Sequence, residues 1–348
     1  MNLPRALRAC AWLVLALPKL AAAADAAPAL HLPLDCKPGE TCWIANHVDL
    51  DPGGGVRDYA CGHLTYDAHS GTDIAVRDLA TMRRGVKVLA AAAGVVRGVR
   101  NDVDDVSIRE RPGGKSEIAD RECGNGVRID HGGGWQTLYC HLRRGSVTVK
   151  PGEQVSAGQP LGLVGLSGET EFPHLHFGVM RNLTTVDPFG GKPGAQGCAP
   201  AGRPLWDAQT LAALPYAPGV IYNFGVAPRM PTAEQVREGV YRGRRVAREA
   251  EAIVVWAEVF GTTAGEALHF TVEAPDGSRF LEQRAAFERS QARAFRAFGR
   301  KRGAAPWSSG TYRVTIAYEK RTAGEPSAGM QRGAGQTPAG IRFNFEIE

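Results

Sequence analysis

The chain has 348 residues, of which 43% are hydrophobic and 22% charged, as in an ordinary globular protein. This length exceeds what one hydrophobic core usually serves, so we expect two domains. The formal net charge of +5 falls to about +2 once the basic residues of the N-terminal segment are removed, which argues against nucleic acid as a partner.

The first segment, residues 1–24, has the pattern of an export signal. Arg5 and Arg8 precede an apolar run over 9–17 that is too short to span a bilayer. Alanines at 22–24 fit a cleavage site. We therefore expect an exported protein, periplasmic or secreted, with no membrane span after signal cleavage. A retained N-terminal anchor is the alternative.

Removing this segment leaves six cysteines, an even number that favours disulfides in an exported chain, with fifteen possible pairings. One pair flanks a Pro-Gly turn and a second flanks a predicted hairpin, which leaves the third pair by elimination. The predicted pairs are Cys36–Cys42, Cys123–Cys140 and Cys61–Cys198. A structural zinc site is less favoured, because no C-x-x-C pair is present.

The next part of the chain predicts an irregular lead and then a β domain. Residues 25–60 are rich in Pro and Gly, whereas 61–190 alternate short Val/Ile/Leu-rich runs with Gly turns. The predicted strands are 88–96, 126–130, 135–141 and 160–166, the middle two forming a hairpin. The charged stretch 101–122 is predicted to be a surface insertion, whose Asp102, Asp104 and Asp105 bind calcium or face solvent.

The rest of the chain predicts a second β unit. Residues 191–219 are a Pro/Gly-rich linker, and 220–348 have the strand composition of a β-sandwich. Its predicted strands are 253–260, 268–277, 310–319 and 341–348. In 281–299 the Ala and Arg content favours a helix, while the spacing of Phe decides nothing. The whole chain is predicted to be all-β and mainly antiparallel.

Three histidine-containing stretches carry the chemistry: HSGTD (69–73), LYCHL (138–142) and HLH (174–176). His69 and Asp73 offer a nitrogen and a carboxylate across a short turn, and one strand histidine would complete a two-His, one-carboxylate set. Such a set binds catalytic zinc and leaves one position open to water. His174 and His176 face the same side of a strand, and spare histidines suit acid–base work near neutral pH.

These stretches, together with GNGVRIDHGGGWQTLYCHL and VKPGEQVSAGQPLGLVGLSG, resemble the lysostaphin-type (LytM-type) zinc metallopeptidases over about residues 61–190. The resemblance implies that one Zn²⁺ per chain is bound by His69, Asp73 and His176. It also implies that His141 and His174 flank the zinc-bound water as catalytic residues. The residue after HLHF is often acidic in that family, whereas Gly178 stands there in this sequence.

The resemblance further implies a zinc-dependent endopeptidase that hydrolyses peptide cross-links of bacterial peptidoglycan, with peptide stems as its partners. For a Gram-negative periplasm, a D-alanyl to diaminopimelate bond is the expected target. A non-catalytic envelope factor that binds peptidoglycan or activates another hydrolase is the main alternative. A secreted zinc protease with protein substrates is a third. A lipoyl- or biotinyl-carrier hairpin is disfavoured, because it needs no His/Asp set and no export. The sequence gives no indication of oligomeric state.

Several other residues have two readings. Tyr66 and His63 could line a cleft, and Asn125 could touch substrate or hold a turn. We expect His131 to be structural. Trp135 is expected to pack in the core, and Asp187 to end the domain in a turn.

Overall fold

The computed structural model describes residues 26–192, 194, 202–320 and 340–348, and strands predominate among them. The predicted all-β, mainly antiparallel fold class is confirmed. The helices are short: α1 (Leu79–Arg84), α2 (Ala208–Ala213), α3 (Ala233–Glu238) and the 3-10 helix η1 (Gly114–Ile118). Within the described part of the chain, no helix has the length and apolar character needed to cross a membrane. The export signal predicted over 1–24 lies outside the described residues.

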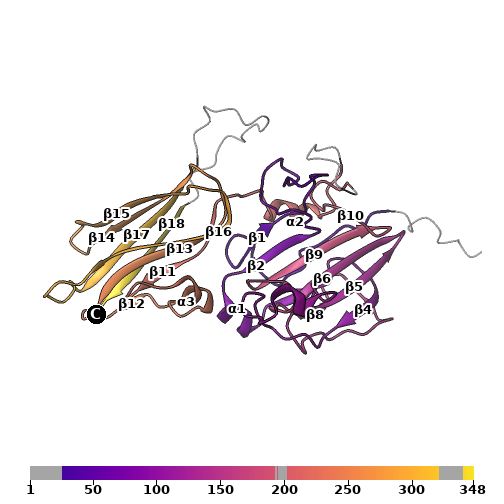
Figure 1. Cartoon of the computed structure of the whole chain (residues 1–348), viewed down its shortest axis with the longest axis horizontal. Coiled ribbons are helices and arrows are strands. Elements are labelled where there is room, and N and C mark those ends of the chain that lie inside the picture. Colours follow the sequence, from indigo (N-terminus) through magenta and orange to yellow (C-terminus); the bar gives the residue numbers. More distant parts are fainter. Residues whose placement is uncertain (1–25, 193, 195–201, 321–339) are drawn as a thin grey trace, which may run out of the picture.

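The N-terminal unit is built on an eight-stranded sheet in the order β1-β2-β9-β6-β5-β4-β7, with β10 beside β9 (Figure 1). All of its strand pairs are antiparallel. The strands are β1 (Cys42–Asn46), β2 (Thr72–Val76), β4 (Gly94–Arg100), β5 (Asn125–Gly132), β6 (Trp135–Leu142), β7 (Gln154–Val155), β9 (His174–Arg181) and β10 (Thr184–Thr185). A two-stranded sheet of β3 (Lys87–Leu89) and β8 (Pro160–Leu163) completes the unit.

The predicted hairpin over 126–130 and 135–141 is confirmed as β5 and β6. The single strand predicted over 88–96 is wrong, because the chain leaves the small sheet after β3 and enters the large sheet at β4. Gly94 lies at that entry, where a Cβ would approach the Asp130 carbonyl oxygen to 2.5 Å. Ala90, Ala91 and Ala92, between the two strands, are buried and serve as a crossing segment.

Residues 25–60 are also more ordered than the expected irregular lead. They contribute strand β1, whose Cys42 to Asn46 pair with β2 at the edge of the large sheet. Leu30 and Leu34 are buried in the core of the N-terminal unit. The predicted linker 191–219 likewise contains α2 and sends Leu205 into that core. The described residues of both segments therefore belong to the packed N-terminal unit, since apolar residues spaced among Pro and Gly reach its core.

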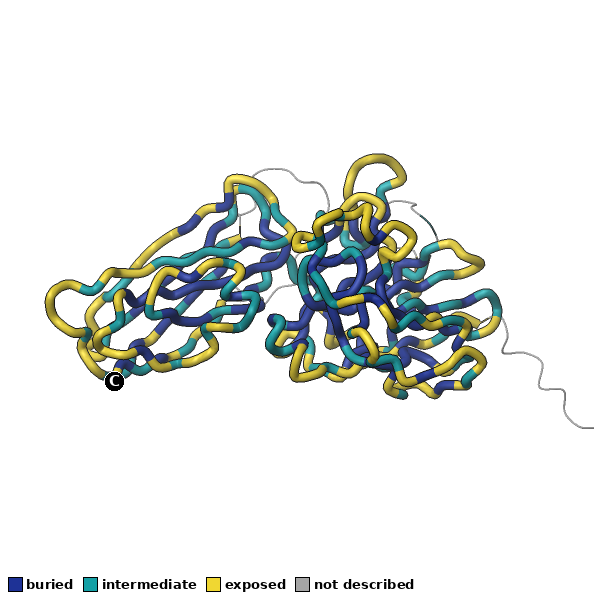
Figure 2. Tube along the Cα trace, turned by 60° about the horizontal axis from the view of Figure 1, so that its bottom comes forward, coloured by how far each residue is buried: buried dark blue, intermediate teal, exposed yellow. Residues whose placement is uncertain are grey.

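The C-terminal unit is a β-sandwich, as predicted. One sheet has the order β11-β13-β16 and the other β12-β18-β17-β14-β15. Its strands are β11 (Val220–Ala227), β12 (Arg245–Val246), β13 (Ala252–Thr262), β14 (Ala267–Glu273), β15 (Arg279–Ala286), β16 (Gln291–Lys301), β17 (Gly310–Glu319) and β18 (Gly340–Ile347). Apolar side chains from both sheets, including Val255, Phe270 and Ile316, form a continuous core between them. Figure 2 shows these buried strands and the exposed turns that join them.

The helix favoured by composition over 281–299 is wrong. This stretch holds most of β15 and β16 and the exposed turn between them. β16 pairs with β13 along ten residue positions, from Thr262 opposite Gln291 to Ala252 opposite Lys301. Pairing with a neighbouring strand outweighs the weak helical preference of Ala and Arg.

The two units meet through apolar side chains. Trp43 and Ala45 of β1 and Ala75 of β2 pack with Tyr222 and Phe260 of the sandwich. The rings of Tyr222 and Phe260 stack with centroids 3.9 Å apart. The three-stranded sheet therefore has its inner face in the sandwich core and part of its outer face against the N-terminal unit.

Two of the predicted disulfides are confirmed. Cys36 is bonded to Cys42, and Cys123 is bonded to Cys140 across the β5–β6 hairpin. Cys198 lies outside the described residues, so the Cys61–Cys198 pair stays a prediction.

Candidate metal centre

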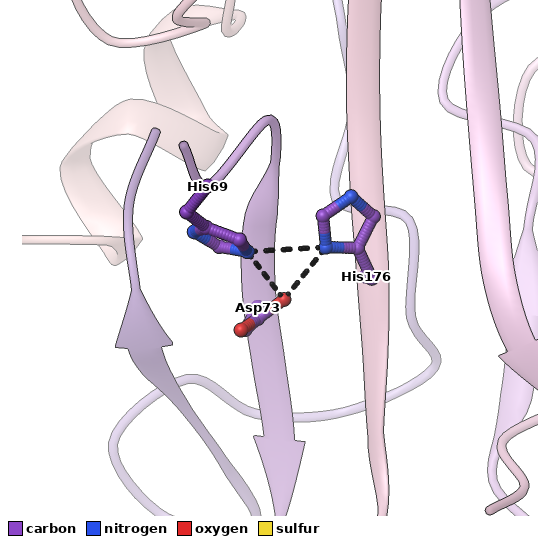
Figure 3. A group of neighbouring side chains, drawn as sticks. All are labelled: His69, Asp73 and His176. Atoms are coloured by element: carbon purple, nitrogen blue, oxygen red, sulfur yellow. Dashed lines mark hydrogen bonds and ion pairs between the residues drawn. The ribbon is translucent and has the colours of Figure 1, made fainter. Parts of the chain in front are cut away.

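Asp73 and His176 are direct neighbours across two strands. β2 and β9 run antiparallel with Asp73 opposite His176, which places both side chains on one face of the sheet. Asp73 Oδ1 lies 2.9 Å from His176 Nδ1. His69 precedes β2 and brings its Nε2 to 3.1 Å from each of these two atoms (Figure 3). Within the described ranges, these three residues are the His, Cys, Asp or Glu group that could hold a metal ion.

The hydrogen bonding of His69 suits this cluster to a cation. His69 Nδ1 lies 2.6 Å from the carbonyl oxygen of His47, and a carbonyl oxygen can only accept. In the neutral ring, Nε2 therefore carries a lone pair, and that lone pair faces a carboxylate oxygen and a second ring nitrogen. A cation between the three atoms relieves their repulsion.

The spacing of the three atoms fits zinc. Zinc–ligand bonds of about 2.0–2.1 Å in a tetrahedron place neighbouring ligand atoms about 3.2–3.4 Å apart. The distances here are 2.9 and 3.1 Å. Two neutral imidazoles and one carboxylate also form a donor set that zinc accepts, with a fourth position left for water.

Two further residues hold the ligands in place. Asn46, opposite Asp73 in β1, donates from Nδ2 to Asp73 Oδ2 at 2.9 Å and leaves Oδ1 for the metal. Gly71 lies under the His176 ring, where a Cβ would approach His176 Nε2 to 2.5 Å. Only glycine leaves room for the ring at this position.

His174 lies on the same face of β9 as His176, and hydrogen bonds to its Nδ1 atom hold its ring. Its Nδ1 is 2.9 Å from the carbonyl oxygen of Phe172 and 3.1 Å from Thr170 Oγ1. The carbonyl accepts the Nδ1 proton, so in the neutral ring Nε2 carries a lone pair. That atom lies 3.4 Å from Asp73 Oδ1. The Phe172 ring also stacks on the His174 ring, with centroids 4.6 Å apart.

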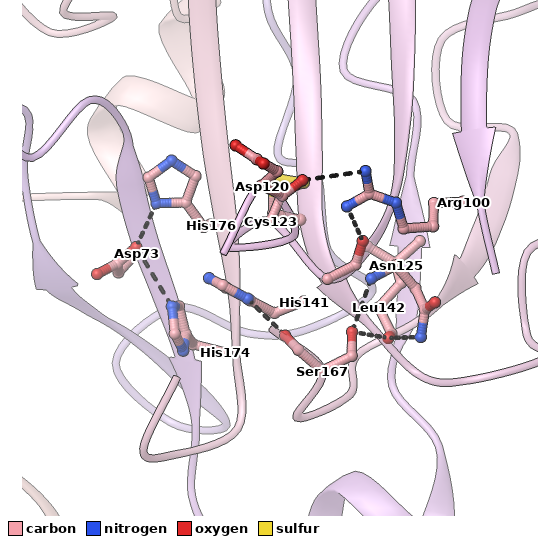
Figure 4. The surroundings of a disulfide bond; sticks show 12 residues. Asp73, Arg100, Asp120, Cys123, Asn125, His141, Leu142, Ser167, His174 and His176 are labelled. Atoms are coloured by element: carbon pink, nitrogen blue, oxygen red, sulfur yellow. Dashed lines mark hydrogen bonds and ion pairs between the residues drawn. A yellow bond between two sulfur atoms is a disulfide. The ribbon is translucent and has the colours of Figure 1, made fainter. Parts of the chain in front are cut away.

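His141 reaches the site from β6, the neighbour of β9. Its Nδ1 lies 2.7 Å from the Ser167 carbonyl oxygen, so Nε2 of the neutral ring again carries a lone pair. Figure 4 shows that this second nitrogen is on the side of Asp73, His174 and His176. The His141 ring centroid is 4.7 Å from that of His174 and 6.0 Å from that of His176.

The backbone of His141 is held in an uncommon conformation. Its φ is +62°, a value that few residues other than glycine adopt. The His141 N–H donates to the Cys123 carbonyl oxygen at 2.8 Å, and Cys123 is bonded to Cys140, the residue before His141. The disulfide and this hydrogen bond together stabilise the turn that directs the ring into the site.

Burial and neighbouring charges set the ionisation of these groups. Burial alone raises the pKa of Asp73, but His69 and His174 lower it well below its usual range, so the carboxylate is ionised. Burial lowers the pKa of His141 well below its usual range, and the nearby His174 and His176 lower it further. Burial also lowers the pKa of His176. Burial also acts to lower the pKa of His69, but the charge of Asp73 and its hydrogen bond outweigh burial and raise it. Neutral imidazoles are therefore favoured for His141 and His176 beside the charged carboxylate.

The structure thus brings together all five residues singled out in the sequence: His69, Asp73, His141, His174 and His176. Tyr66 lies at the edge of this group, half exposed, with its ring centroid 4.3 Å from that of His69. His63 lies elsewhere, with Nε2 3.3 Å from Thr263 Oγ1 of the sandwich.

Other residues with two readings are structural. Asn125 is fully buried and holds the backbone of Val103 and Leu142 through its amide. His131 contacts Ala93 and Thr137 and lies away from the metal centre. Trp135 is buried in the core, and Asp187 accepts a backbone hydrogen bond from Gly190 in a turn.

The three aspartates of the 101–122 stretch do not form a calcium site. Asp102 pairs with Arg121, Asp104 pairs with Arg144, and Asp105 accepts backbone N–H groups. Their carboxylates stabilise the loop against the rest of the unit.

Sequence reasoning missed the residues that orient the site histidines. Phe172, Thr170, Ser167 and the backbone of His47 each contact a ring nitrogen, and Asn46 contacts the carboxylate. For Phe172 and Thr170 a signal was available, because both stand within four residues of His174 in a turn-rich stretch. For Ser167 and Asn46 the sequence contained no such signal, because their contacts join segments far apart in the chain.

Comparison with known proteins agrees with this geometry. Residues 67–188 match Peptidase family M23. Peptidoglycan DD-endopeptidase ShyA of Vibrio cholerae serotype O1 is 36% identical over 109 residues, which are 31% of this chain and 19% of the relative. DD-carboxypeptidase/endopeptidase Mpg of Neisseria meningitidis serogroup B is 32% identical over 124 residues, 36% of this chain and 23% of the relative.

Among solved structures, a zinc containing peptidase from Vibrio cholerae is 26% identical, with a TM-score of 0.27, over 42% of this chain and 39% of that one. The chain spans about a fifth of the length of these two curated relatives. Residues 67–188 form a Peptidase family M23 domain.

Proposed function

We propose that this protein is a zinc-dependent metalloendopeptidase that hydrolyses peptide cross-links of bacterial peptidoglycan. The observation that carries the proposal is the convergence of five side chains on one face of the sheet. His69, Asp73 and His176 would bind the zinc ion, and His141 and His174 turn a lone pair of the neutral ring toward the same space.

With a zinc ion bound by these three ligands, the site would supply a Lewis acid that lowers the pKa of a water molecule and polarises the scissile carbonyl. The Nε2 atoms of His141 and His174 are placed to accept the proton that the water loses. Both rings keep their Nδ1 hydrogen bonds to backbone carbonyls when protonated, so the same bonds orient the neutral ring and stabilise the charged one. A protonated ring can then return the proton to the leaving amine.

The substrate and the cellular location rest on relatives rather than on geometry. One relative is named as a peptidoglycan DD-endopeptidase and another as a DD-carboxypeptidase/endopeptidase. Such a substrate lies outside the cytoplasm, in agreement with the export signal predicted over 1–24. We therefore propose peptidoglycan peptide stems as the partner and the periplasm or the exterior as the location.

The test is digestion of isolated peptidoglycan sacculi. The purified, disulfide-bonded chain is supplied with zinc, and the muropeptides are separated and identified by mass spectrometry. We expect loss of cross-linked dimers, abolished by a chelator and restored by added zinc. The masses of the products identify the bond that is cut.

Unchanged dimers with zinc bound to the chain would contradict the proposal. In that case, binding of the chain to sacculi would favour the non-catalytic envelope factor. Cleavage of a denatured protein substrate with intact sacculi would instead favour a secreted protease.

A further inference from the structure

A second polar cavity lies where the two units meet, away from the metal centre. It follows β2 on the N-terminal unit and is closed on the other side by α3 and the segment leading to β12. Its volume is about 180 Å³, and its lining includes Arg77, Asp78, Phe224, Arg242, Arg244 and Trp256. Arg77 is four residues after Asp73, which corresponds to about 13 Å along an extended strand.

The cavity carries more positive than negative charge. Three of the lining residues are arginines, and Asp78 is the one carboxylate among them. Asp78 is already engaged, because it caps helix α1 by accepting from the Thr81 N–H at 2.8 Å and is paired with Arg242. Its charge therefore offsets that of Arg242, and Arg77 and Arg244 have no carboxylate partner among the described residues.

The polar atoms at the wall of the cavity are also unsatisfied. No described residue accepts a hydrogen bond from the Arg244 guanidinium, and its Nη1 is buried without a partner. Trp256 is 2% exposed, and its Nε1 is likewise buried and unpartnered. Arg77 has a single described acceptor, the carbonyl oxygen of Glu40 at 3.3 Å. Buried donors without acceptors are costly, and Arg77 and Arg244 also line the cavity, so their guanidiniums favour a ligand that accepts hydrogen bonds.

Both guanidiniums without a carboxylate partner contact the same aromatic ring. The Arg77 and Arg244 guanidinium carbons lie 5.7 and 5.1 Å from the centroid of the same ring, that of Phe224. Arg244 also lies 4.1 Å from the centroid of Phe343. Contact with a ring face leaves guanidinium N–H groups available to an anion, which can accept from two of them at once.

Burial and nearby positive charge both act against the charged form of these arginines. Burial lowers the pKa of Arg77, and the nearby Arg84 lowers it further. Burial also lowers the pKa of Arg244, and so does the charge of Arg77. A negative charge in the cavity would offset both effects.

We propose that this cavity is an anion-binding site for a carboxylate or phosphate group carried on a small organic body. The volume exceeds what a bare oxyanion fills, and the walls of Phe224, Tyr241 and Trp256 suit an apolar or amide-bearing portion next to the charge. Arg77 belongs to the N-terminal unit, while Arg242 and Arg244 belong to the sandwich. A bound anion therefore bridges the two units. This site is independent of the peptidase function proposed above.

The experiment measures binding of defined probes to the purified full chain by isothermal titration and by the shift in melting temperature. The probes are inorganic phosphate and acetyl-D-alanyl-D-alanine, with the C-terminal amide of that dipeptide and sodium chloride of matched ionic strength as controls. We expect the dipeptide acid or phosphate to bind and to raise the melting temperature. The amide and chloride should do neither. Binding of the dipeptide alone indicates a carboxylate ligand, and binding of phosphate alone indicates a phosphate ligand.

Variants locate the binding. Arg77→Gln and Arg244→Gln should each weaken binding by about tenfold or more, because each removes a charge-assisted fork. Arg244→Lys keeps the charge and should weaken binding less. Arg313→Gln, an exposed arginine on β17, should leave it unchanged. His176→Ala should also leave it unchanged, which separates this site from the metal centre.

Two results would overturn the inference. One is that neither probe binds above the chloride control. The other is that a probe binds Arg244→Gln and Arg244→Lys as tightly as the original chain, with all proteins shown to be folded by their melting curves in the absence of ligand.

Discussion

Backbone carbonyls decide which nitrogen of each site histidine carries the proton. The carbonyls of His47, Phe172 and Ser167 accept from the Nδ1 atoms of His69, His174 and His141. His176 differs, because its own Nδ1 faces Asp73. His174 and His176 therefore share one strand face but present different nitrogens, Nε2 and Nδ1, toward Asp73. His69 also presents Nε2, so the ring nitrogen alone does not separate the proposed ligands from the proposed catalytic residues.

The proposed roles predict that His176→Ala and His174→Ala act differently. His176→Ala should lose both zinc and activity, because it removes one of three ligands. His174→Ala should keep most of the zinc and lose about 10²- to 10⁴-fold in kcat, the usual contribution of an acid–base group. Zinc is measured by elemental analysis after gel filtration. Equal loss of zinc in the two variants would show that the roles are wrongly assigned.

Asp187 predicts a pH-dependent stability. Burial, with a smaller contribution from the nearby Asp58, raises the pKa of Asp187 from its usual 3.8 to about 7. The folded chain then binds this proton more tightly than the unfolded chain, so the contribution of Asp187 to stability is lost as the pH rises from about 4 through 7. At about 1.4 kcal/mol for each pKa unit, the loss is at most about 4 kcal/mol.

The check is Asp187→Asn, which keeps the size of the side chain and removes the titration. The melting temperature of the variant relative to the original chain should increase between pH 5 and pH 8. Asp207→Asn serves as the control, since the pKa of Asp207 is lowered and its carboxylate stays ionised throughout this range. A constant difference between Asp187→Asn and the original chain across these pH values would contradict the prediction.

At the scale of elements, the site depends on the register of three neighbouring strands. β2 places Asp73 opposite His176, and β6 places Cys140 opposite the same residue, so that His141 follows beside it. The sequence could predict the hairpin and the two histidines of β9, because turn residues and a period of two are local signals. It could not predict Asn46 opposite Asp73, because that pairing joins segments far apart in the chain.

The sandwich also supports a catalytic element. Phe172 stacks on His174, and its other neighbours are Phe260, with ring centroids 5.7 Å apart, and the Arg293 guanidinium at 5.3 Å. Phe260 and Arg293 lie on β13 and β16 of the sandwich. These strands therefore fix the turn whose carbonyl oxygen orients His174.

We accordingly expect Phe260→Leu to lower kcat by about ten- to a hundredfold, since small misplacements of a catalytic group are costly. Zinc content and KM should change little. Phe280→Leu, a partly buried aromatic of the sandwich that contacts Trp307 and Tyr312, is the matched control. The measurement is steady-state kinetics on a cross-linked muropeptide with zinc determined in parallel. Loss of zinc in Phe260→Leu, or an equal loss of kcat in the control, would contradict a positioning role.

At the scale of the whole molecule, the sandwich packs on the face of the large sheet that carries the site. Ala75 is two residues after Asp73 on β2, so both side chains face the same way. Ala75 is fully buried with Trp43, Tyr222 and Phe260 in the cluster between the units. The alternation of each strand was readable in the sequence. The sequence did not predict that the sandwich covers this face of β1 and β2, because no local pattern distinguishes a strand face in a core from one at an interface.

A chain that ends at residue 219 should therefore fold poorly or associate. Removing the sandwich exposes Trp43, Ala45 and Ala75, an apolar patch that soluble proteins normally cover. We expect a lower melting temperature than that of the full chain, and a molar mass by light scattering that rises with concentration. Trp43→Lys in the shortened chain should reduce this association, because a charge on the patch opposes self-contact. If the shortened chain stays monomeric and melts at the same temperature as the full chain, the two units are independent. The contact between Phe260 and Phe172 would then be incidental to the site.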